Sequence, residues 1–401
     1  MSDVLIVGAG PAGSVLAALL AQRSIDALLL DRAAFPRPKT CGDYLSPGTV
    51  RLLHRLDLLG PVQAGGARRL SGMELVSPDG TTFTATYPAP ARSAGARPYA
   101  LGIARATLDA LLLEHARRWG VKCLEGFQVT DLIREDGRVG GVKGVGPQGP
   151  EAYRARLVVG ADGRNSVVAR RLALHRPHPR LRRMALVASY EGASGLGDHG
   201  LISVGDGSYC ILNPIGESRI NAAIVVDQAV ALAWRGRQDE LFGRRLATFP
   251  RAETALGTMR RTGPLRCLGP LAYRARRTAA PGALLIGDAA GFYDPFTGEG
   301  VFHALQSAER AAGCIVRILR SGRPAAPLLA RFDRDQRRTL AARERLGAAL
   351  QAILRRPAIA NGAARFLRYR PPLADLLMGV IGDLLPPRAL LSASALKYWR
   401  R

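Results

Sequence analysis

Several features that would indicate common protein classes are scarce or missing from this sequence. It contains five cysteines among 401 residues, and they are widely scattered. Because their number is odd, we expect reduced thiols in a cytoplasm and neither a disulfide framework nor a zinc site. No uninterrupted apolar run approaches the length of about 18 residues that a membrane-spanning helix needs. The chain opens directly on a predicted strand, and we therefore expect no signal peptide.

Lysine is equally scarce, because four of the 57 basic residues are lysine and the others are arginines spread along the chain. The formal net charge of +25 is typical of proteins that bind nucleic acid. However, the interleaved aromatic and basic residues of a single-strand binder are absent, and biased codon usage alone produces abundant arginine. We expect no nucleic-acid partner and a cytoplasmic location, with peripheral contact to an anionic membrane surface left open.

Histidine spacing gives little support for a metal centre. His175 and His178 lie three residues apart and His199 follows, but no cysteine or carboxylate cluster accompanies them. A stable zinc site needs three or four nitrogen, sulfur or carboxylate ligands from the protein. We therefore expect no metal ion, and the chemistry has to come from another part of the chain.

The N-terminal stretch contains the motif around which the rest of the chain is organised. A short apolar run leads into Gly-Ala-Gly-Pro-Ala-Gly at residues 8–13, and a predicted helix and a second strand that ends at Asp31 follow. In this pattern Gly8 permits a tight turn, Gly10 lets the backbone approach a pyrophosphate, and Gly13 lets helix and strand pack closely. Asp31 follows Gly10 by about 20 residues, where a carboxylate accepts hydrogen bonds from a ribose. The unit predicts a dinucleotide-binding site.

Two later segments repeat the arrangement of a buried strand, a turn that carries a carboxylate, and a helix start. The first has Asp162 in an Ala-Asp-Gly turn, and the second has Asp288 in Gly-Asp-Ala-Ala-Gly, with a long helix predicted from about Val301. Asp288 would hold hydroxyl groups of the nucleotide. The helix start near Gly300 would direct its positive end at a group that becomes negative, as reduced flavin does.

Two residues between these units each have two interpretations. Cys41 lies beside Gly42 in a proline-marked loop, where it could face a bound flavin or be a small buried residue, and spacing alone favours the second. Arg105 opens a predicted helix that extends to Trp119, where a positive charge opposes the helix dipole. Arg105 either binds a phosphate or ribityl group or is one more surface arginine.

The three motifs, in this order, resemble a large FAD-dependent group that contains para-hydroxybenzoate hydroxylase-like monooxygenases, flavin halogenases and geranylgeranyl reductases. Lys-Thr-Cys-Gly-Asp at residues 39–43 and Thr-Gly-Glu-Gly at residues 297–300 are most similar to the geranylgeranyl reductase branch. The resemblance implies FAD as cofactor. Together with the motifs, it gives the following expected FAD contacts: Gly8, Gly10, Ala12, Gly13, Asp31, Arg32, Cys41, Gly42, Arg105, Val129, Asp162, Asp288, Pro295, Gly300 and Val301.

Departures from the family patterns bear on the reaction. Aromatic hydroxylases usually have a histidine after the Gly-Asp-Ala-Ala turn, and this chain has Gly291. The reductases carry Tyr-x-Trp-x-Phe-Pro, and the corresponding stretch from Tyr209 to Pro214 keeps the tyrosine and the proline alone. Flavin halogenases keep two tryptophans in a comparable place, and both are absent here. Tyr209 and Asn213 are the expected substrate contacts.

The fold class that follows is α/β. We expect a Rossmann-like FAD-binding domain interleaved with an α+β substrate domain that carries an antiparallel sheet, and a C-terminal helical region. Helices are expected over residues 48–59 and 229–256. The expected boundaries are 1–61, 99–180 and 275–326 for the discontinuous FAD-binding domain, 62–98 and 181–274 for the substrate domain, and 327–401 for the helical region.

The reaction stays open between two main interpretations, because chemistry depends on the site and not on the fold. The favoured one is a monooxygenase that hydroxylates a lipophilic or aromatic metabolite through a flavin hydroperoxide. The alternative is a reductase that saturates carbon–carbon double bonds of a prenyl or lipid substrate, with Cys41 as the candidate catalytic proton donor. A non-enzymatic flavoprotein is a minor third. Electrons are expected from NAD(P)H or a partner reductase, since no second nucleotide-binding unit is present, and the oligomeric state is left open.

Overall fold

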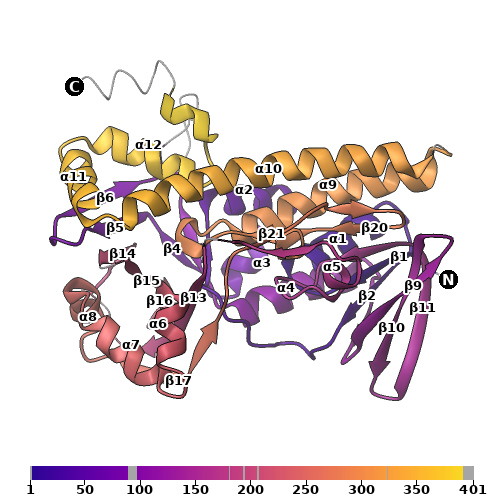
Figure 1. The fold of residues 1–401 in the computed structure, drawn as a ribbon, viewed down its shortest axis with the longest axis horizontal. Coiled ribbons are helices and arrows are strands. Elements are labelled where there is room, and N and C mark those ends of the chain that lie inside the picture. Colours follow the sequence, from indigo (N-terminus) through magenta and orange to yellow (C-terminus); the bar gives the residue numbers. More distant parts are fainter. Residues whose placement is uncertain are drawn as a thin grey trace.

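The computed structural model of the chain describes residues 2–88, 97–179, 181–192, 195–205, 207–322 and 324–391. Two large sheets lie next to each other, and long helices run along one side of the molecule (Figure 1). The sheets have different strand patterns, parallel in one and mainly antiparallel in the other, as the sequence predicts. Of the expected C-terminal helical region, residues 392–401 lie outside the described residues.

The first sheet is built on parallel strands that are buried on both faces, which explains their continuous apolar sequences. A two-stranded antiparallel extension continues from its long strand at residues 149–160. In spatial order the main strands are β19 (Ala279–Ala280), β20 (Ala283–Leu285), β11 (Gly149–Gly160), β1 (Ser2–Val7), β2 (Ala27–Asp31) and β8 (Lys122–Glu125), and the extension is β10 (Arg138–Gly146) with β9 (Gln128–Glu135).

Helices cover this sheet and direct their N-termini toward the carboxyl ends of its strands. α1 (Pro11–Ala21) begins immediately after the glycine turn that follows β1 and is buried along almost its whole length. Both α9 (Gly300–Arg320) and α4 (Arg105–Arg118) pack against α1. Two helix starts, those of α1 and α9, are therefore available at the edge where nucleotides bind in such sheets.

The second sheet has one face against a helical layer and the other toward the centre of the molecule. Ala185 and Val187 pack on the inner face, whereas Leu186 and Ala188 pack against α6 (Gln228–Ala233), α7 (Gln238–Leu246) and α8 (Pro250–Leu256). Its strands are antiparallel except for one parallel pair, β14 with β5. In spatial order they are β17 (Arg260–Leu268), β13 (Arg183–Glu191), β16 (Arg219–Asp227), β15 (Ser208–Ile215), β14 (His199–Gly205), β5 (Gly72–Val76) and β6 (Thr82–Thr86).

Two expected helices are shorter than the apolar pattern predicts. The segment 48–59 forms α2 (Pro47–Arg55) and α3 (Leu59–Ala64), because Asp57 between them has a φ of +55° that no α-helix accommodates. The segment 229–256 consists of the three short helices α6 to α8, with Pro250 opening the last one. Residues 62–98, expected to belong wholly to the second sheet's domain, also supply β4 (Arg68–Leu70) to a separate small sheet.

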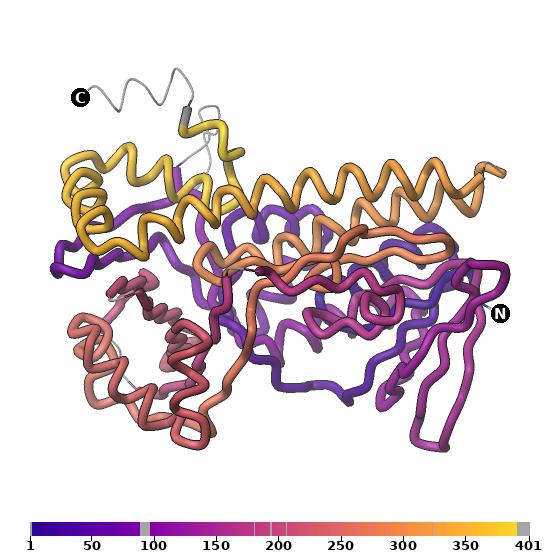
Figure 2. The backbone as a smooth tube through the Cα atoms, in the orientation of Figure 1, coloured from indigo at the N-terminus to yellow at the C-terminus, as the bar shows by residue number. Residues whose placement is uncertain are grey.

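Two small sheets and the remaining helices connect the halves. The small sheets are β3 (Tyr44–Leu45), β7 (Ala100–Gly102) and β4, and β12 (His175–Pro177), β18 (Tyr273–Ala275) and β21 (Gly291–Phe292); α5 is Val167–Arg171. The C-terminal helices are α10 (Ala325–Leu354), α11 (Pro357–Arg368) and α12 (Pro371–Ile381). α11 and α12 fold back onto β6, far from α10's own start (Figure 2). Within the described ranges, no helix has the length and apolar character to cross a bilayer.

Candidate functional site

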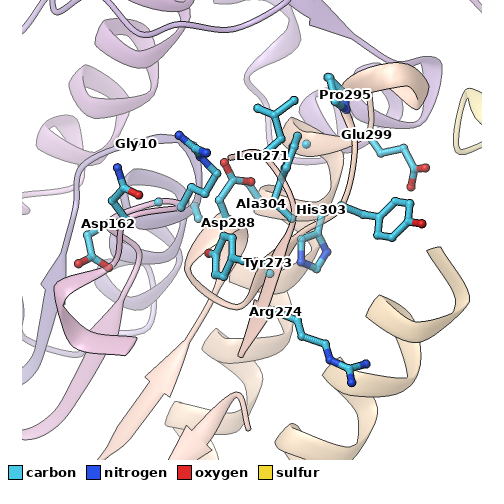
Figure 3. Close-up of a pocket in the computed structure, with 18 of the residues that line it drawn as sticks. Gly10, Asp162, Leu271, Tyr273, Arg274, Asp288, Pro295, Glu299, His303 and Ala304 are labelled. Carbon is cyan, nitrogen blue, oxygen red and sulfur yellow. The ribbon is translucent and has the colours of Figure 1, made fainter. Parts of the chain in front are cut away.

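A cavity of about 2460 Å³ lies between the two large sheets. At one end its wall is formed by the glycine turn after β1 and by the loops that carry the motif carboxylates. At the other end its wall is the apolar inner face of the antiparallel sheet, together with α12. Figure 3 shows Asp288 near the middle of this cavity, with Gly10 and Asp162 on one side and Pro295 and Glu299 on the other. Residues far apart in the chain therefore meet in one site.

Each of the three motif glycines meets a different structural requirement. Gly8 has a φ of +103°, and a Cβ there would lie 2.5 Å from the Ala161 carbonyl oxygen. A Cβ on Gly13 would overlap the Gly8 carbonyl, so Gly13 lets α1 approach β1. A Cβ on Gly10 would instead meet no backbone, and its nearest neighbour would be Arg37 Nη2, in ordinary van der Waals contact at 3.6 Å. The cradle at Gly10 and the free N–H groups of the first turn of α1 fit a pyrophosphate.

Asp31, the expected ribose ligand, also stabilises the glycine turn through hydrogen bonds of its carboxylate. Its Oδ2 accepts a hydrogen bond from the Ala9 N–H at 2.8 Å, and its Oδ1 accepts one from the Ala33 N–H at 2.9 Å. The guanidinium of Arg37 lies 3.6 Å from Oδ2. Asp31 lines the cavity and keeps a lone pair on each oxygen for a ligand. Its position is therefore compatible with both roles.

Asp162 and Asp288, the two later motif carboxylates, differ in how they are held. Asp162 Oδ2 accepts a hydrogen bond from the Val167 N–H at 2.6 Å and so caps α5. Asp288 accepts no hydrogen bond from any described residue, and burial raises the pKa of its carboxyl group. Asp288 is partly buried and lines the cavity, so a ligand in the cavity can reach its carboxyl group. Asp288 is thus open to the hydroxyl groups of a ligand, as the sequence predicts.

Sequence reasoning missed the basic side chains that surround Asp288. Lys39 is partly buried, and desolvation lowers the pKa of its amine although Asp288 attracts the charged form. Arg164 is also near enough to influence Asp288, and Tyr273 places a phenol beside it without a hydrogen-bond partner among the described residues. The charge of Lys39 next to the Cys41 loop was visible in the sequence. The sequence does not indicate that Lys39 lies near Asp288, almost 250 positions later.

Cys41 lies where the two halves of the molecule meet. The side-chain amide of Asn221 on β16 donates to the Cys41 carbonyl at 2.9 Å, and that of Asn213 on β15 donates to the Gly42 carbonyl at 2.8 Å. Cys41 is one of the residues that line the cavity. Burial raises the pKa of its thiol, and the neighbouring Arg105 guanidinium offsets that effect in part. The sulfur is therefore a protonated thiol at neutral pH.

Arg105 is neither a surface residue nor free to neutralise a phosphate alone. Its guanidinium forms a bidentate ion pair with Asp109, with Nε–Oδ1 and Nη2–Oδ2 distances of 2.8 and 2.9 Å. Its backbone N–H donates to Asp43 Oδ1 at 3.1 Å. This fully buried Asp109 keeps Arg105 rigid against Cys41. Arg105 lines the cavity, so contact with a cofactor stays a prediction.

The remaining predicted contacts divide into residues that reach the cavity and residues that support its wall. Tyr209 is fully buried, and its hydroxyl donates to Asp294 Oδ1 at 2.6 Å, so it supports the loop before Pro295. Asn213 lines the cavity but uses its amide to hold Gly42. The residues that line the cavity as expected are Gly8, Gly10, Ala12, Asp31, Arg32, Cys41, Gly42, Arg105, Val129, Asp162, Asp288, Pro295, Gly300 and Val301.

The far end of the cavity is an apolar chamber. Its floor on β13 and β16 is made of small and branched side chains, with Ala223 on the central strand. The chamber is therefore suited to a lipophilic molecule, because burial of apolar surface is its main source of affinity. The side chains that form it are Met73, Ala185, Val187, Ile202, Ile211, Ala223, Val225, Leu268, Leu271, Phe296, Met378 and Ile381.

Comparison with known proteins decides the family. A family profile described as FAD binding domain matches residues 1–345. The chain belongs to this FAD-binding family. This confirms the resemblance and the α/β fold read from the motifs, and the flavoprotein is an FAD-dependent oxidoreductase by family. The residues present fit the cofactor, since the backbone at Gly10 leaves room at the start of α1 and the cavity-lining Asp288 accepts no hydrogen bond from a described residue.

Individual relatives of the flavoprotein carry out different reactions. It is 30% identical over 332 residues to a menaquinone reductase of Mycobacterium tuberculosis, covering 78% of this chain and 76% of the relative. The solved structure of CmlS, a flavin-dependent halogenase, is 28% identical with a TM-score of 0.78, covering 84% of this chain and 62% of that one. The structure of PqsL, a probable FAD-dependent monooxygenase from Pseudomonas aeruginosa, is 26% identical with a TM-score of 0.71, covering 90% and 98%.

Proposed function

We propose that the flavoprotein is an FAD-dependent reductase that saturates a carbon–carbon double bond of a lipophilic substrate. The observation that carries the proposal is the position of Cys41, which lies between the cofactor loops and the apolar chamber. Reduction of a double bond needs a hydride on one carbon and a proton on the other. A protonated thiol at this junction supplies the proton, and the chamber supplies the affinity for an apolar substrate.

The residues of the chain have separate tasks in this reaction. Bound FAD, once reduced, supplies the hydride. The apolar side chains of β13 and β16 hold the substrate and exclude water, and Asn213 and Asn221 hold the backbone that carries Cys41. The proton leaves Cys41 Sγ for the second carbon of the double bond, and solvent returns a proton to the thiolate afterwards. The product has two more hydrogens than the substrate.

Oxygen transfer, which the sequence alone favours, is the second candidate. The water-excluding chamber and the likeness to PqsL support it. Cys41 argues against oxygen transfer, because that reaction generates an oxidant in a cavity whose lining includes a residue with an oxidisable sulfur. For either reaction we propose NAD(P)H or a partner reductase as the source of electrons and a peripheral membrane contact as the route of a lipid substrate.

Product mass distinguishes the two reactions. The protein is reduced anaerobically with a stoichiometric amount of dithionite and incubated with a polyprenyl lipid that carries no quinone ring, because reduction of a quinone to its hydroquinone also adds two hydrogens. The product is identified by mass spectrometry. A gain of two hydrogens without oxygen supports reduction. If no change occurs until oxygen is admitted and the product then gains one oxygen atom, the protein is a monooxygenase and the proposal is wrong.

A further inference from the structure

Two largely buried carboxyl groups share one arginine at the start of α9. Arg343 Nη1 lies 2.8 Å from Glu299 Oε2, and Arg343 Nη2 lies 3.2 Å from Asp383 Oδ1. Glu299 immediately precedes the first residue of α9, and Arg343 and Glu299 both line the cavity. The guanidinium also lies over the ring of Phe302, 5.1 Å from its centre. This cluster therefore borders the helix terminus that faces the cofactor end of the cavity.

Asp383 comes from the end of the chain and is fixed by several contacts. The Ser46 hydroxyl, which caps α2, donates to Asp383 Oδ2 at 2.8 Å, and the Gly48 N–H donates to the Gly382 carbonyl at 2.8 Å. Asp383 has a φ of +61°, an uncommon conformation for a residue other than glycine. It follows α12 and lies beyond the residues that the family profile matches. A segment outside the family match thus reaches the wall of the cofactor site.

The charge of the cluster depends on whether Asp383 holds a proton. Burial raises the pKa of the Asp383 carboxyl group, and Glu299 raises it further, whereas Arg343 lowers it. When Asp383 is protonated, the positive charge of Arg343 and the negative charge of Glu299 cancel. When Asp383 is ionised, the cluster has a net charge of −1. Among the described residues around the cluster, Tyr44 interacts with the charge of Asp383, and His303 is held neutral because burial, Arg343 and Arg310 lower its pKa.

We propose that Asp383 is a positioning residue for the cofactor: it holds Arg343 against Glu299 at the start of α9 and takes up a proton when negative charge accumulates there. The positive end of α9 then remains available to a group that becomes negative on reduction. The proposal rests on FAD binding and is independent of whether the reaction is a reduction or an oxygen transfer. Asp383 acts through Arg343, since it is not itself among the cavity-lining residues.

The first test measures the reduction potential of bound FAD against pH in the parent protein and in Asp383→Asn. The asparagine keeps an oxygen that accepts from Arg343 but cannot ionise. We expect equal potentials at pH 6. As the pH rises and Asp383 ionises, the added negative charge opposes electron uptake, so the parent potential falls below that of the variant by pH 9. Parallel curves over this range would overturn the proposal.

Asp375→Asn is the matched control for that measurement. Asp375 lies on α12, and its Oδ1 accepts a hydrogen bond from the Thr86 N–H at 2.7 Å, away from Arg343. A purely structural effect of weakening the C-terminal helices would appear in both variants as a lower melting temperature. We expect the pH dependence of the potential to change in Asp383→Asn and to stay that of the parent in Asp375→Asn.

A second measurement does not require bound FAD. A carboxyl whose folded pKa is raised stabilises the fold fully below its unfolded pKa and loses that contribution as pH rises through the folded pKa. The melting temperature of the parent should therefore fall relative to Asp383→Asn between pH 5 and pH 9. A constant difference would show that Asp383 does not bind the proton. If the protein binds no FAD, the cofactor assignment fails, and this measurement still tests Asp383.

Discussion

Asn213 on β15 and Asn221 on β16 lie directly opposite each other in the antiparallel sheet, and their side-chain amides hold successive carbonyl groups of the loop that carries Cys41. The sheet that lines the apolar chamber therefore fixes the loop that carries Cys41. Both amides donate to backbone groups separated from them by more than 170 residues. The position of Cys41 relative to the apolar chamber thus depends on one pair of cross-strand residues.

Replacement of Asn221 by alanine should lower the free energy of unfolding substantially, although it removes only one short side chain. In Asn221→Ala the Cys41 carbonyl and the buried Asp43 Oδ2 both lose a donor, at 2.9 and 2.8 Å. An unpaired buried acceptor costs about 1–3 kcal/mol, and more when it is charged. Urea unfolding measures the loss. The control is Asn361→Ala on α11, whose side-chain oxygen accepts a solvent-exposed hydrogen bond from the Asp79 N–H. Its loss should change the free energy of unfolding by about 0.5 kcal/mol, and similar effects of the two variants would contradict the role of Asn221.

The parts of the site that could be predicted from sequence are those that short-range patterns encode. Gly8, Gly10 and Gly13 lie close together around one turn, and Asp288 directly follows a buried strand. In each case the neighbouring residues in the sequence explain why the motif residue is there. The helix at 48–59 was predicted too long because apolar spacing does not reveal the positive φ at Asp57. Local patterns predict elements well and their ends less well.

The parts that could not be predicted depend on contacts between distant segments. Nothing near Asn221 in the sequence indicates that it holds Cys41, and nothing near Asp383 indicates Arg343 or Ser46. Tyr209 was expected to touch substrate because of its strand motif, yet its hydroxyl is used by Asp294. Such pairings follow from packing of the two halves against each other, which a single sequence does not display.

Asp288→Ala and Asp162→Ala should separate cofactor binding from structural support. Asp288 has no hydrogen-bond partner among the described residues, so its loss should remove a charge-assisted hydrogen bond to the ligand, worth about 1.5–3 kcal/mol or about 10- to 100-fold in the Kd for FAD. Asp162 caps α5 through the Val167 N–H, so its loss should lower the melting temperature more than the FAD affinity. Fluorescence titration and thermal unfolding measure the two effects. An unchanged Kd in Asp288→Ala would refute its assignment.

Asp43 should make stability depend on pH between about 4 and 7. Burial raises the pKa of its carboxyl group to about 6, although hydrogen bonds from Asn221 and from the Arg105 N–H oppose the shift. Because the folded pKa is higher than the usual 3.8, the contribution to stability is complete at low pH and is lost as the pH rises through 6. Relative to Asp43→Asn, the parent should lose about 3 kcal/mol across this range. A pH-independent difference in urea unfolding would exclude the shift.

Ala223→Phe should block the apolar chamber and leave the cofactor end intact. Ala223 lines the cavity from the central strand β16, whereas its neighbour Ala222 packs on the opposite face against the helical layer. A phenyl group at 223 occupies space that substrate would use, so binding of Nile red, a neutral apolar dye, should weaken at least tenfold. Ala222→Phe should instead overpack the core and cost about 1–3 kcal/mol of stability. Equal Nile red binding in the parent and Ala223→Phe would place the substrate elsewhere.

Cys41→Ser distinguishes the two candidate reactions at matched FAD occupancy. A serine hydroxyl is a far weaker acid than a thiol, so a reductase that takes its proton from Cys41 Sγ should lose product formation about 10²-fold or more. The rate at which the flavin becomes reduced should not change, because that step does not use the thiol. A monooxygenase needs Cys41 for its backbone contacts alone, and its turnover should stay within a few-fold of the parent.

We expect the large loss. Stopped-flow absorbance follows flavin reduction, and mass spectrometry follows the product in the same sample. Cys123→Ser is the matched control, since Cys123 is a free, partly buried thiol on β8 outside the residues that line the cavity. If Cys41→Ser and Cys123→Ser both retain turnover near that of the parent, Cys41 is no proton donor. The observation that favours double-bond reduction would then be gone, and oxygen transfer would become the better account of the chamber.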